Sequence, residues 1–300
     1  MNKKISAILL MVLFFISCKK ENQKESFPDK TNNNLKYFGY TLIDVGWDDP
    51  TDNEYKTNYI DEVQDFSNIA DILVINPTEN IINRLHVFDR YKVKAVLHLS
   101  EIFFELKNTG GHKSGFIYGL RSDYRQRWDA FISVNDLINN HIYINSFYVG
   151  EEPSWNGIPE DEFKEACDYI KSTIPQVPIL VIEAYPDIHN IYTPVSVDLV
   201  GFDHYFLPRP LTDTVFLNEL LILKSKIKTH QKIFLVMDAH WIEFLHGNAG
   251  ITENDIATIA RDYYKIANSD TTIVGIIGNF WPSGLDVNSS VGPEIFLKMF

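Results

Sequence analysis

The sequence predicts an α/β protein whose single folded domain is a (β/α)8 barrel, also called a TIM barrel. Three observations predict it. Short runs rich in Val, Ile, Phe and Tyr alternate with segments of helical periodicity. Several runs are apolar almost throughout, which is typical of parallel strands that are buried on both faces. Eight such runs, each but one followed by a helical segment, fit the length of about 250 residues that is usual for this barrel.

The eight expected strands are short and bounded by polar residues. They are YFGYTLIDV (37–45), ADILVIN (70–76), VKAVLHLS (93–100), NSFYVGE (145–151), PILVIEAY (178–185), DLVGFDHYF (198–206), KIFLVMDAH (232–240) and TIVGIIGNF (272–280). A doubly wound open sheet is the alternative. It would usually carry a glycine-rich phosphate turn after the first strand, and DVGWDD is not such a turn.

Two of the intervening segments have clear amphipathic helical patterns. Residues 161–174 place Phe163, Ala166, Cys167, Ile170 and Ile174 on one stripe, and residues 252–269 place Ile256, Ile259, Ala260, Tyr263 and Ile266 on another. TEND, at the start of the second segment, predicts a capping box. Cys167 lies on the apolar stripe of the first segment, so it is predicted to be a core residue and not a nucleophile.

Two connections depart from the regular pattern. PDIHNIYTPVSV, between residues 185 and 198, is too short and too rich in proline for a full helix, so an irregular loop is expected there. LKNTGGHKSGFIYGLRS (106–122) is a long glycine-bearing segment after the third strand. We expect it to be a loop that forms a lid or a wall of the site, because long loops on the active face usually have functional roles.

The N-terminal residues predict export and lipid anchoring. A basic start is followed by an apolar run (5–16) that is too short to span a bilayer comfortably, and the run ends at Ser17-Cys18. This pattern resembles the lipobox of bacterial lipoproteins, which implies a signal peptide over 1–17 and lipidation of Cys18. An ordinary secretory signal is the alternative. Residues 18–34 are polar and read as a flexible tether, and 35–300 as the barrel domain.

The charge and the cysteine content of the chain limit which binding partners are expected. The formal net charge of −13 argues against nucleic acid and against a polybasic contact with anionic lipid. With Cys18 lipidated, Cys167 has no partner for an intrachain disulfide. We expect a monomer without a cofactor, held at the membrane only by its N-terminal lipid. The expected location is the outer membrane, facing the periplasm or the cell surface.

Polar and aromatic residues gather at the predicted C-terminal ends of the strands, where (β/α)8 barrels place their active sites. Taken in strand order, they are Asp44 and Trp47; His98 and Glu101; Glu151, Glu152 and Trp155; Glu183 and Tyr185; Asp203, His204 and Tyr205; Asp238, His240 and Trp241; and Asn279 and Trp281. Of the five tryptophans, only Trp128 lies on a predicted helix. Aromatic platforms beside carboxylates suit the apolar faces and hydroxyl rims of sugar rings, although tryptophans can also simply plug a barrel.

GEEP after the fourth strand, DHYF after the sixth, VMDAHW after the seventh and NFW after the eighth together resemble the (β/α)8 glycoside hydrolases of the large retaining superfamily. The resemblance implies that Glu152 is the catalytic acid/base and that Asp238 stands at the position of the nucleophile. Two residues depart from the family pattern. Glu151 replaces an Asn that contacts the sugar, and Asp238 is shorter by one methylene than the usual Glu.

These departures leave the carboxylate pair open. A shorter Asp238 could widen the gap to Glu152 and favour inversion, or the nucleophile could be Asp203 or Glu101. An ionised Glu151 would raise the pKa of Glu152, as a general acid requires. However, adjacent strand residues normally point to opposite faces, so we expect that only one of the two glutamates faces the barrel.

Three functions compete at this stage. The first is hydrolysis of O-glycosidic bonds in an extracellular or periplasmic oligo- or polysaccharide, with Glu152 and Asp238 as catalytic residues. The residues expected to bind substrate are Trp47, Asp44, His98, Glu151, Trp155, Tyr185, Asp203, His204, Tyr205, His240, Trp241 and Trp281. The second is a non-catalytic glycan-binding lipoprotein on the same barrel. The third is a metal-dependent hydrolase that uses His98, His204, Asp238 and His240.

Overall fold

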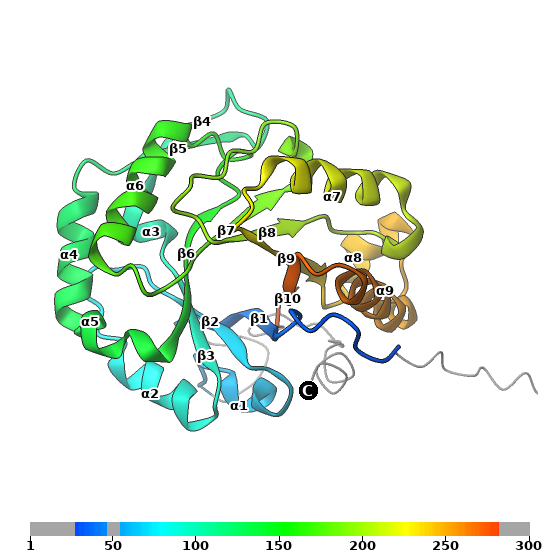
Figure 1. Cartoon of the computed structure of the whole chain (residues 1–300), viewed down its shortest axis with the longest axis horizontal. Helices are drawn as coiled ribbons and strands as arrows, with labels where there is room; N and C mark the ends of the chain where they lie inside the picture. The colour runs from blue at the N-terminus through cyan, green and yellow to red at the C-terminus, as the bar shows by residue number, and fades with distance from the viewer. Residues whose placement is uncertain (1–27, 47–54, 282–300) are drawn as a thin grey trace, which may run out of the picture.

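A computed structural model describes residues 28–46 and 55–281 and shows a closed barrel of eight parallel strands (Figure 1). Around the barrel the order is β1-β10-β9-β8-β7-β6-β3-β2. The strands are β1 (Tyr37–Asp44), β2 (Ile69–Leu73), β3 (Lys94–His98), β6 (Ile144–Glu151), β7 (Ile179–Ala184), β8 (Leu199–Asp203), β9 (Lys232–Asp238) and β10 (Ile273–Asn279). Each overlaps one of the eight predicted runs, so the predicted (β/α)8 fold is confirmed.

Helices surround the barrel and cover the outer face of its sheet (Figure 1). The α-helices are α1 (Ile60–Val63), α2 (Ile82–Arg90), α3 (Ser100–Phe103), α4 (Tyr124–Asn135), α5 (Leu137–Asn140), α6 (Glu160–Thr173), α7 (Thr214–Lys226), α8 (Glu243–His246) and α9 (Ile256–Ser269). Short 3-10 turns are η1 (Gln64–Phe66), η2 (His141–Tyr143), η3 (Tyr185–Asp187), η4 (Pro210–Thr212), η5 (Gly247–Ala249) and η6 (Glu253–Asp255). Within the described ranges, no helix is both long and apolar enough to cross a membrane.

The apolar residues form two layers, because alternate side chains of each strand point to opposite sides of the sheet. The larger layer lies between the strands and the helices and contains residues such as Phe147, Val149 and Phe163. The smaller one fills the barrel interior, where Val96, Tyr148 and other side chains from several strands meet. The interior is therefore packed, and among the described residues the larger space lies at its C-terminal mouth.

The amphipathic patterns identified the helices that pack on this sheet. α6 and α9 occupy the two predicted segments, and Cys167 is fully buried on α6, which confirms its role in the core. The predicted capping box is present, with Thr252 and Asp255 as its two members. Between β7 and β8 the chain forms only the short turn η3, as the prolines predicted.

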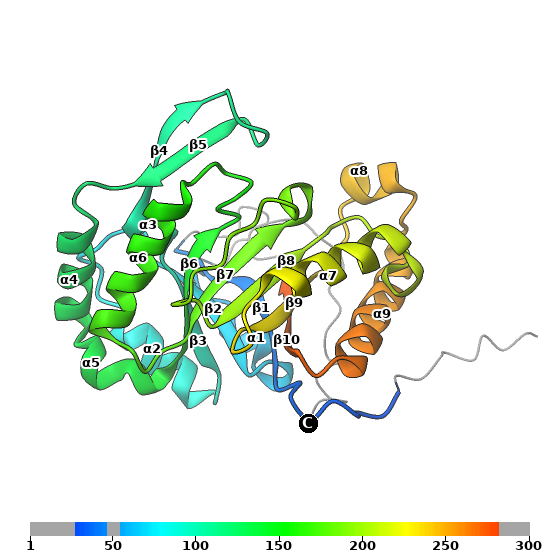
Figure 2. The ribbon, with the colours of Figure 1, turned by 45° about the horizontal axis from the view of Figure 1, so that its top comes forward.

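The segment after β3 differs from its prediction. In place of a structureless loop it forms an antiparallel hairpin of β4 (Phe104–Thr109) and β5 (Phe116–Leu120), which projects beyond the barrel body (Figure 2). Gly110, Gly111 and Gly115 adopt positive φ angles in its turn, a conformation that glycine reaches without strain. The glycines therefore mark a hairpin turn rather than a long loop.

The folded domain begins before residue 35, its expected N-terminal boundary. Thr31 and Asn32, which the sequence places in the tether, bind the end of α9: the backbone N–H of Thr31 donates to Asn268 Oδ1 at 2.7 Å, and the buried Asn32 amide donates to the Ala267 carbonyl at 2.8 Å. Such contacts satisfy carbonyls at a helix end. The predicted signal peptide and Cys18 lie outside the described residues, as does Trp47.

Candidate functional site

A cavity of about 310 Å³ opens at the C-terminal mouth of the barrel. Its volume lies at the lower end of the usual range for small-ligand sites. All eight barrel strands, or the residues just after them, contribute to its wall. The lining residues are Thr41, Leu42, Asp71, His98, Tyr148, Glu151, Glu152, Ile182, Asp203, Tyr205, Val236, Asn279 and Phe280.

The end of β6 brings two adjacent glutamates into this cavity. The pairing of β6 with β7 shifts between Tyr148 and Gly150, which is a bulge that adds one residue to β6. Gly150 faces α6, because a Cβ built on it would lie 2.6 Å from the ring of Phe163. Glu151 then turns inward, and Glu152 follows with a φ of 49°, in the left-handed region. Both therefore line the cavity, so the expectation that one would face a helix is wrong.

Glu152 and Asp203 form a hydrogen-bonded carboxyl pair. Burial raises the pKa of Asp203 well above its usual value, and the charge of Glu152 raises it further. Burial and then the charge of Glu151 raise the pKa of Glu152, although the hydrogen bond with Asp203 opposes the increase. Two close carboxyls cannot both ionise cheaply, so the pair holds a proton.

Glu151 has the opposite electrostatic environment. Its carboxylate lies 3.4 Å from His98 Nε2, and its side chain is 59% exposed. The hydrogen bond with His98 lowers the pKa of Glu151, more than partial burial raises it. The cavity thus holds an ionised carboxylate directly beside a protonated pair. Environments that separate the pKa values of neighbouring carboxyls are a mark of acid–base sites.

Two acids that sequence reasoning did not select support this site. Asp71 is buried at the base of the cavity, where burial raises its pKa to about 6. Glu183, which the sequence showed only as a strand-end residue, is fully buried, and burial raises its pKa to about 8. Glu183 accepts hydrogen bonds from the Ser154 hydroxyl at 3.0 Å and from its backbone N–H at 3.3 Å, and so fixes the loop after Glu152. An acid inside an apolar strand run was the available signal for Asp71.

Asp238 does not line the cavity, although it ends β9 as predicted. It is buried beneath the segment after β8, where the backbone N–H of Phe206 donates to its Oδ2 at 2.6 Å. The fully buried His246 Nε2 lies 3.4 Å from its Oδ1. The structure therefore brings Glu152 to Asp203 rather than to Asp238. A catalytic role for Asp238 remains a prediction.

Other predicted site residues lie around the mouth without lining the cavity. Asp44 binds Arg84 at 2.8 Å and Asn58 at 2.7 Å in a separate surface pocket. Tyr185 and His204 stack with ring centroids 3.8 Å apart, and His204 Nδ1 lies 2.6 Å from Glu219 on α7. His98, Glu151, Glu152, Asp203 and Tyr205 are the predicted residues that the cavity unites.

The tryptophans in the described ranges lie outside the cavity lining. Trp241 donates its indole N–H to the Ile251 carbonyl at 3.2 Å, and Trp281 donates to Glu62 at 2.6 Å; both pack against the outer core. Trp155 is half-buried in the loop after β6. The aromatic side chains that do line the cavity are Tyr148, Tyr205 and Phe280. A role for tryptophans as sugar platforms stays a prediction.

The three histidines of the metal hypothesis are separated. His98 faces the cavity, His204 contacts α7, and the ring of His240 stacks on Phe280 with centroids 4.1 Å apart. Across residues 28–46 and 55–281, no three His, Cys, Asp or Glu side chains are placed to hold a metal ion. The described residues therefore give no support to the metal-dependent alternative.

Neither a family model nor a curated protein matches the sequence. Solved structures do resemble the barrel. A GH113 β-1,4-mannanase matches with a TM-score of 0.54 and 13% identity over 88% of this chain and 99% of its own. Xylanase 10B from Thermotoga maritima matches with a TM-score of 0.52 and 11% identity over 89% of this chain and 94% of its own. ScGas2 matches with a TM-score of 0.51 and 12% identity over 88% of this chain and 64% of its own. At such identities the likeness is one of fold, and it confirms the (β/α)8 barrel.

Proposed function

We propose that this protein hydrolyses O-glycosidic bonds of an oligo- or polysaccharide. The observation that supports this best is the cavity at the barrel mouth, where an ionised Glu151 adjoins the proton-sharing pair Glu152–Asp203. Glycoside hydrolysis needs one carboxylic acid to protonate the leaving oxygen and one carboxylate to stabilise or attack the sugar carbon. The shared fold with a mannanase and a xylanase adds support by analogy only.

Glu152 is the proposed general acid. Its pKa is raised, so it keeps a proton at a pH where an exposed glutamate has lost its own. Its neighbour Glu151 supplies the negative charge that an oxocarbenium-like transition state needs. Asp203 hydrogen-bonds Glu152 and shares its proton, so it is the proposed second carboxylate in the form of the pair in which Glu152 carries that proton. A directly hydrogen-bonded pair is closer than the roughly 5–5.5 Å of retaining enzymes and the roughly 6.5–9.5 Å of inverting ones, so the two carboxyls must separate when substrate binds, and the pair predicts neither outcome.

The proposed site of action is outside the cytoplasm. The proposal draws on the basic start, the apolar run and Ser17-Cys18 at the N-terminus. A lipid on Cys18 and the polar residues after it would hold the barrel close to the membrane, with its mouth free for an envelope or external glycan.

The proposal is tested by incubating the purified full chain with a panel of neutral, amino and acidic polysaccharides and measuring the release of reducing ends. Glu152→Gln should lower kcat/KM by roughly 100-fold or more, because a general acid contributes at least that much. The matched control is Glu101→Gln. Glu101, which the sequence offered as a possible nucleophile, is an exposed acid on α3 that contacts Arg121 at 3.4 Å and lies outside the cavity lining. Equal activity of the two variants would exclude Glu152 as the acid.

A non-catalytic glycan-binding protein is the second candidate. The burial of Asp238 beneath the Phe206 segment favours it, because the nucleophile position that the family resemblance implies is then closed. Titration calorimetry with the glycans of the same panel separates the two functions. A binder holds a glycan without releasing reducing ends, whereas the enzyme shows turnover that is lost in the Glu152→Gln variant.

A further inference from the structure

Left-handed backbone gathers at the mouth of the barrel. In the described ranges, the residues other than glycine with a positive φ are Leu42, Lys92, Asp136, Glu152 and Phe206. Lys92 and Asp136 follow the ends of α2 and α4, where a left-handed residue commonly terminates a helix. The other three lie near the ends of β1, β6 and β8. Leu42 and Glu152 line the cavity but Phe206 does not, so the conformation of Phe206 calls for a separate explanation.

Buried groups hold Phe206 in this conformation. Its φ is 62°, which is unfavourable for a bulky side chain. Its backbone N–H donates to Asp238 Oδ2 at 2.6 Å, and its ring meets the ring of His246 in a T-shaped arrangement with centroids 5.1 Å apart. Asp238 and His246 are both buried, yet Phe206 is 39% exposed. Buried polar groups thus keep an aromatic ring partly in water, which the burial of apolar surface alone does not explain.

The exposed ring adjoins the cavity at the barrel mouth. The ring of Phe206 lies 6.4 Å, between centroids, from the ring of Tyr205, and Tyr205 lines the cavity. The cavity itself, with about 310 Å³, is at the lower end of the range for small-ligand sites. A glycan of two or more rings therefore extends beyond it.

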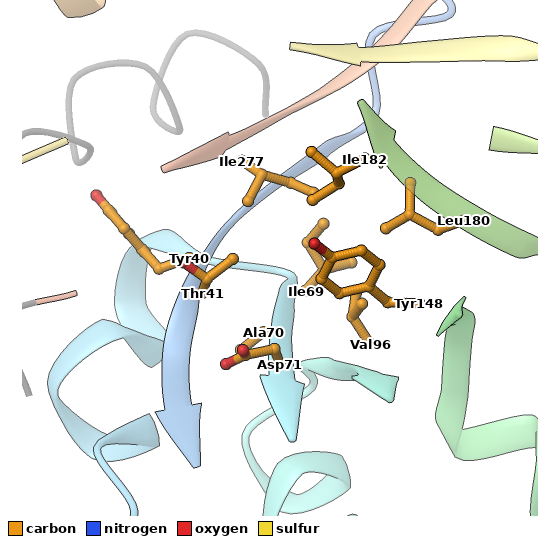
Figure 3. A pocket seen from close by; sticks show the side chains of 10 residues that line it. All are labelled: Tyr40, Thr41, Ile69, Ala70, Asp71, Val96, Tyr148, Leu180, Ile182 and Ile277. Carbon is orange, nitrogen blue, oxygen red and sulfur yellow. The ribbon is translucent and has the colours of Figure 1, made fainter. Parts of the chain in front are cut away.

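A glycan cannot extend from the cavity into the barrel. Asp71, Tyr148 and Ile182 line both the cavity and a second, enclosed space of about 10 Å³. Figure 3 shows Tyr148, Leu180 and Ile182 gathered around that space. Such a volume holds about one water molecule and no sugar ring. The next ring of a glycan must therefore lie on the rim of the cavity, where Phe206 is exposed.

We propose that Phe206 is the platform on which a second sugar ring stacks, next to the ring in the cavity, and that Asp238 positions it. The inference rests on the proposed function and adds a binding subsite to that site. The C–H face of a pyranose is apolar and packs well on an exposed aromatic ring. A platform that is already fixed loses little freedom when the sugar binds. Asp238 then acts through Phe206, without touching the sugar.

The test compares the affinity for one sugar ring with the affinity for two. The probes are glucose, mannose, xylose and N-acetylglucosamine, each as the monosaccharide and as its β-1,4-linked dimer, and binding is measured by ligand-observed NMR. Every chain carries Glu152→Gln, so that no probe is cleaved. We expect the dimer of the preferred sugar to bind about three- to tenfold tighter than its monomer, which is what stacking on one aromatic ring contributes.

Variants of Phe206 show whether this ring is the cause. Phe206→Leu removes the flat ring and should bring the dimer-to-monomer ratio of affinities to about one, with monomer binding retained. Phe206→Tyr keeps the ring and should keep the ratio. Phe116→Leu is the matched control, because Phe116 is 45% exposed and its ring pairs with Tyr118 on the hairpin; its ratio should not change.

Variants of Asp238 test the positioning role. Asp238→Ala removes the acceptor of the Phe206 N–H and should lower the ratio, whereas Asp238→Asn keeps an acceptor and should preserve it. A loss of stability alone would not change the ratio of the two affinities. If a thermal melt shows that Asp238→Ala is unfolded, Asp238→Ser replaces it, because the serine hydroxyl reaches less far than the carboxylate.

Two results overturn the inference while leaving the proposed hydrolysis intact. One is equal binding of monomer and dimer, and the other is a Phe206→Leu chain with an unchanged ratio, or with a fall no larger than that of Phe116→Leu. A ratio in the folded Asp238 variant equal to that of its parent would refute the positioning role of Asp238. Binding of no probe contradicts the inference and the proposed function together.

Discussion

Glu151 and Glu152 are chemically identical neighbours, and the structure gives them opposite tendencies to hold a proton. His98 lowers the pKa of Glu151 by hydrogen bonding to its carboxylate, whereas burial and the charge of Glu151 raise the pKa of Glu152. The first glutamate is thereby suited to stabilise positive charge and the second to donate a proton. This division depends on both side chains entering the same cavity.

Glu151→Gln should move the alkaline limb of the pH–activity profile to lower pH. The general acid must be protonated, so activity is lost as the pH rises through the pKa of Glu152. Removing the charge of residue 151 removes one cause of the raised pKa, and the loss then begins earlier. kcat/KM is measured between pH 4 and 9, with Glu101→Gln as a control whose limb should not move. An alkaline limb at the wild-type position would show that Glu151 does not tune Glu152.

Asp203→Asn should reduce turnover far more than Asp238→Asn. Asp203 hydrogen-bonds the general acid inside the cavity, and we expect its replacement to cost roughly 100-fold in kcat/KM. Asparagine at 238 can still accept the N–H of Phe206 through its side-chain oxygen, and we expect a loss below about tenfold. The test is to measure kcat/KM of both variants on the best substrate of the polysaccharide panel. A loss in Asp238→Asn as large as that in Glu152→Gln would restore Asp238 as the second catalytic carboxylate.

At the scale of elements, the end of β6 determines the site. The bulge before Gly150 and the left-handed Glu152 turn both carboxyls toward the cavity, and Gly150 lets the strand lie against Phe163 of α6. A side chain at residue 150 would push the strand end away from the helix. The position of the acids thus depends on a contact on the opposite face of the sheet.

Gly150→Ala should lower both stability and activity. The added Cβ would lie 2.6 Å from the Phe163 ring, so strand or helix must shift, and overpacking of this kind costs about 1–3 kcal/mol. Gly247→Ala is the matched control, because a Cβ there meets nothing within 4 Å and its φ is ordinary. Denaturant unfolding and kcat/KM are compared for both variants. If Gly150→Ala behaves like the control, the close contact does not position the carboxyls.

The sequence predicted the strands well because a parallel strand buried on both faces is a continuous apolar run, and eight such runs allow few folds. It also located Glu151, Glu152 and Asp203 by their place at strand ends. It could not predict that both glutamates face inward, because the bulge at Gly150 depends on tertiary contacts with α6. The burial of Asp238 was equally hidden, since its partner is a backbone N–H from another strand's loop.

At the scale of the whole molecule, buried acids oppose stability at alkaline pH. Glu183 and Asp71 have pKa values raised to about 8 and about 6 from ordinary values of 4.5 and 3.8, with burial as the first cause in each case. At a pH above the ordinary values, the unfolded chain releases these protons while the folded state still keeps them, and this difference favours the unfolded state. The carboxyls that shape the site therefore impose a cost on the fold that grows with pH.

Glu183→Gln should flatten the dependence of stability on pH. The folded pKa of Glu183 lies above its unfolded value, so the unfolded state binds fewer protons, and the free energy of unfolding falls as the pH rises from 4.5 to about 8. The fall attributable to Glu183 has an upper limit on the order of 4 to 5 kcal/mol. Glutamine mimics the protonated acid, so the variant should nearly equal the wild type at pH 5 and exceed it at pH 9. Urea unfolding at pH 5, 7 and 9 measures this, with Glu101→Gln as the exposed control. Parallel curves for Glu183→Gln and the wild type would mean that Glu183 is already ionised in the folded protein near neutral pH, and that the Ser154 donors outweigh its burial.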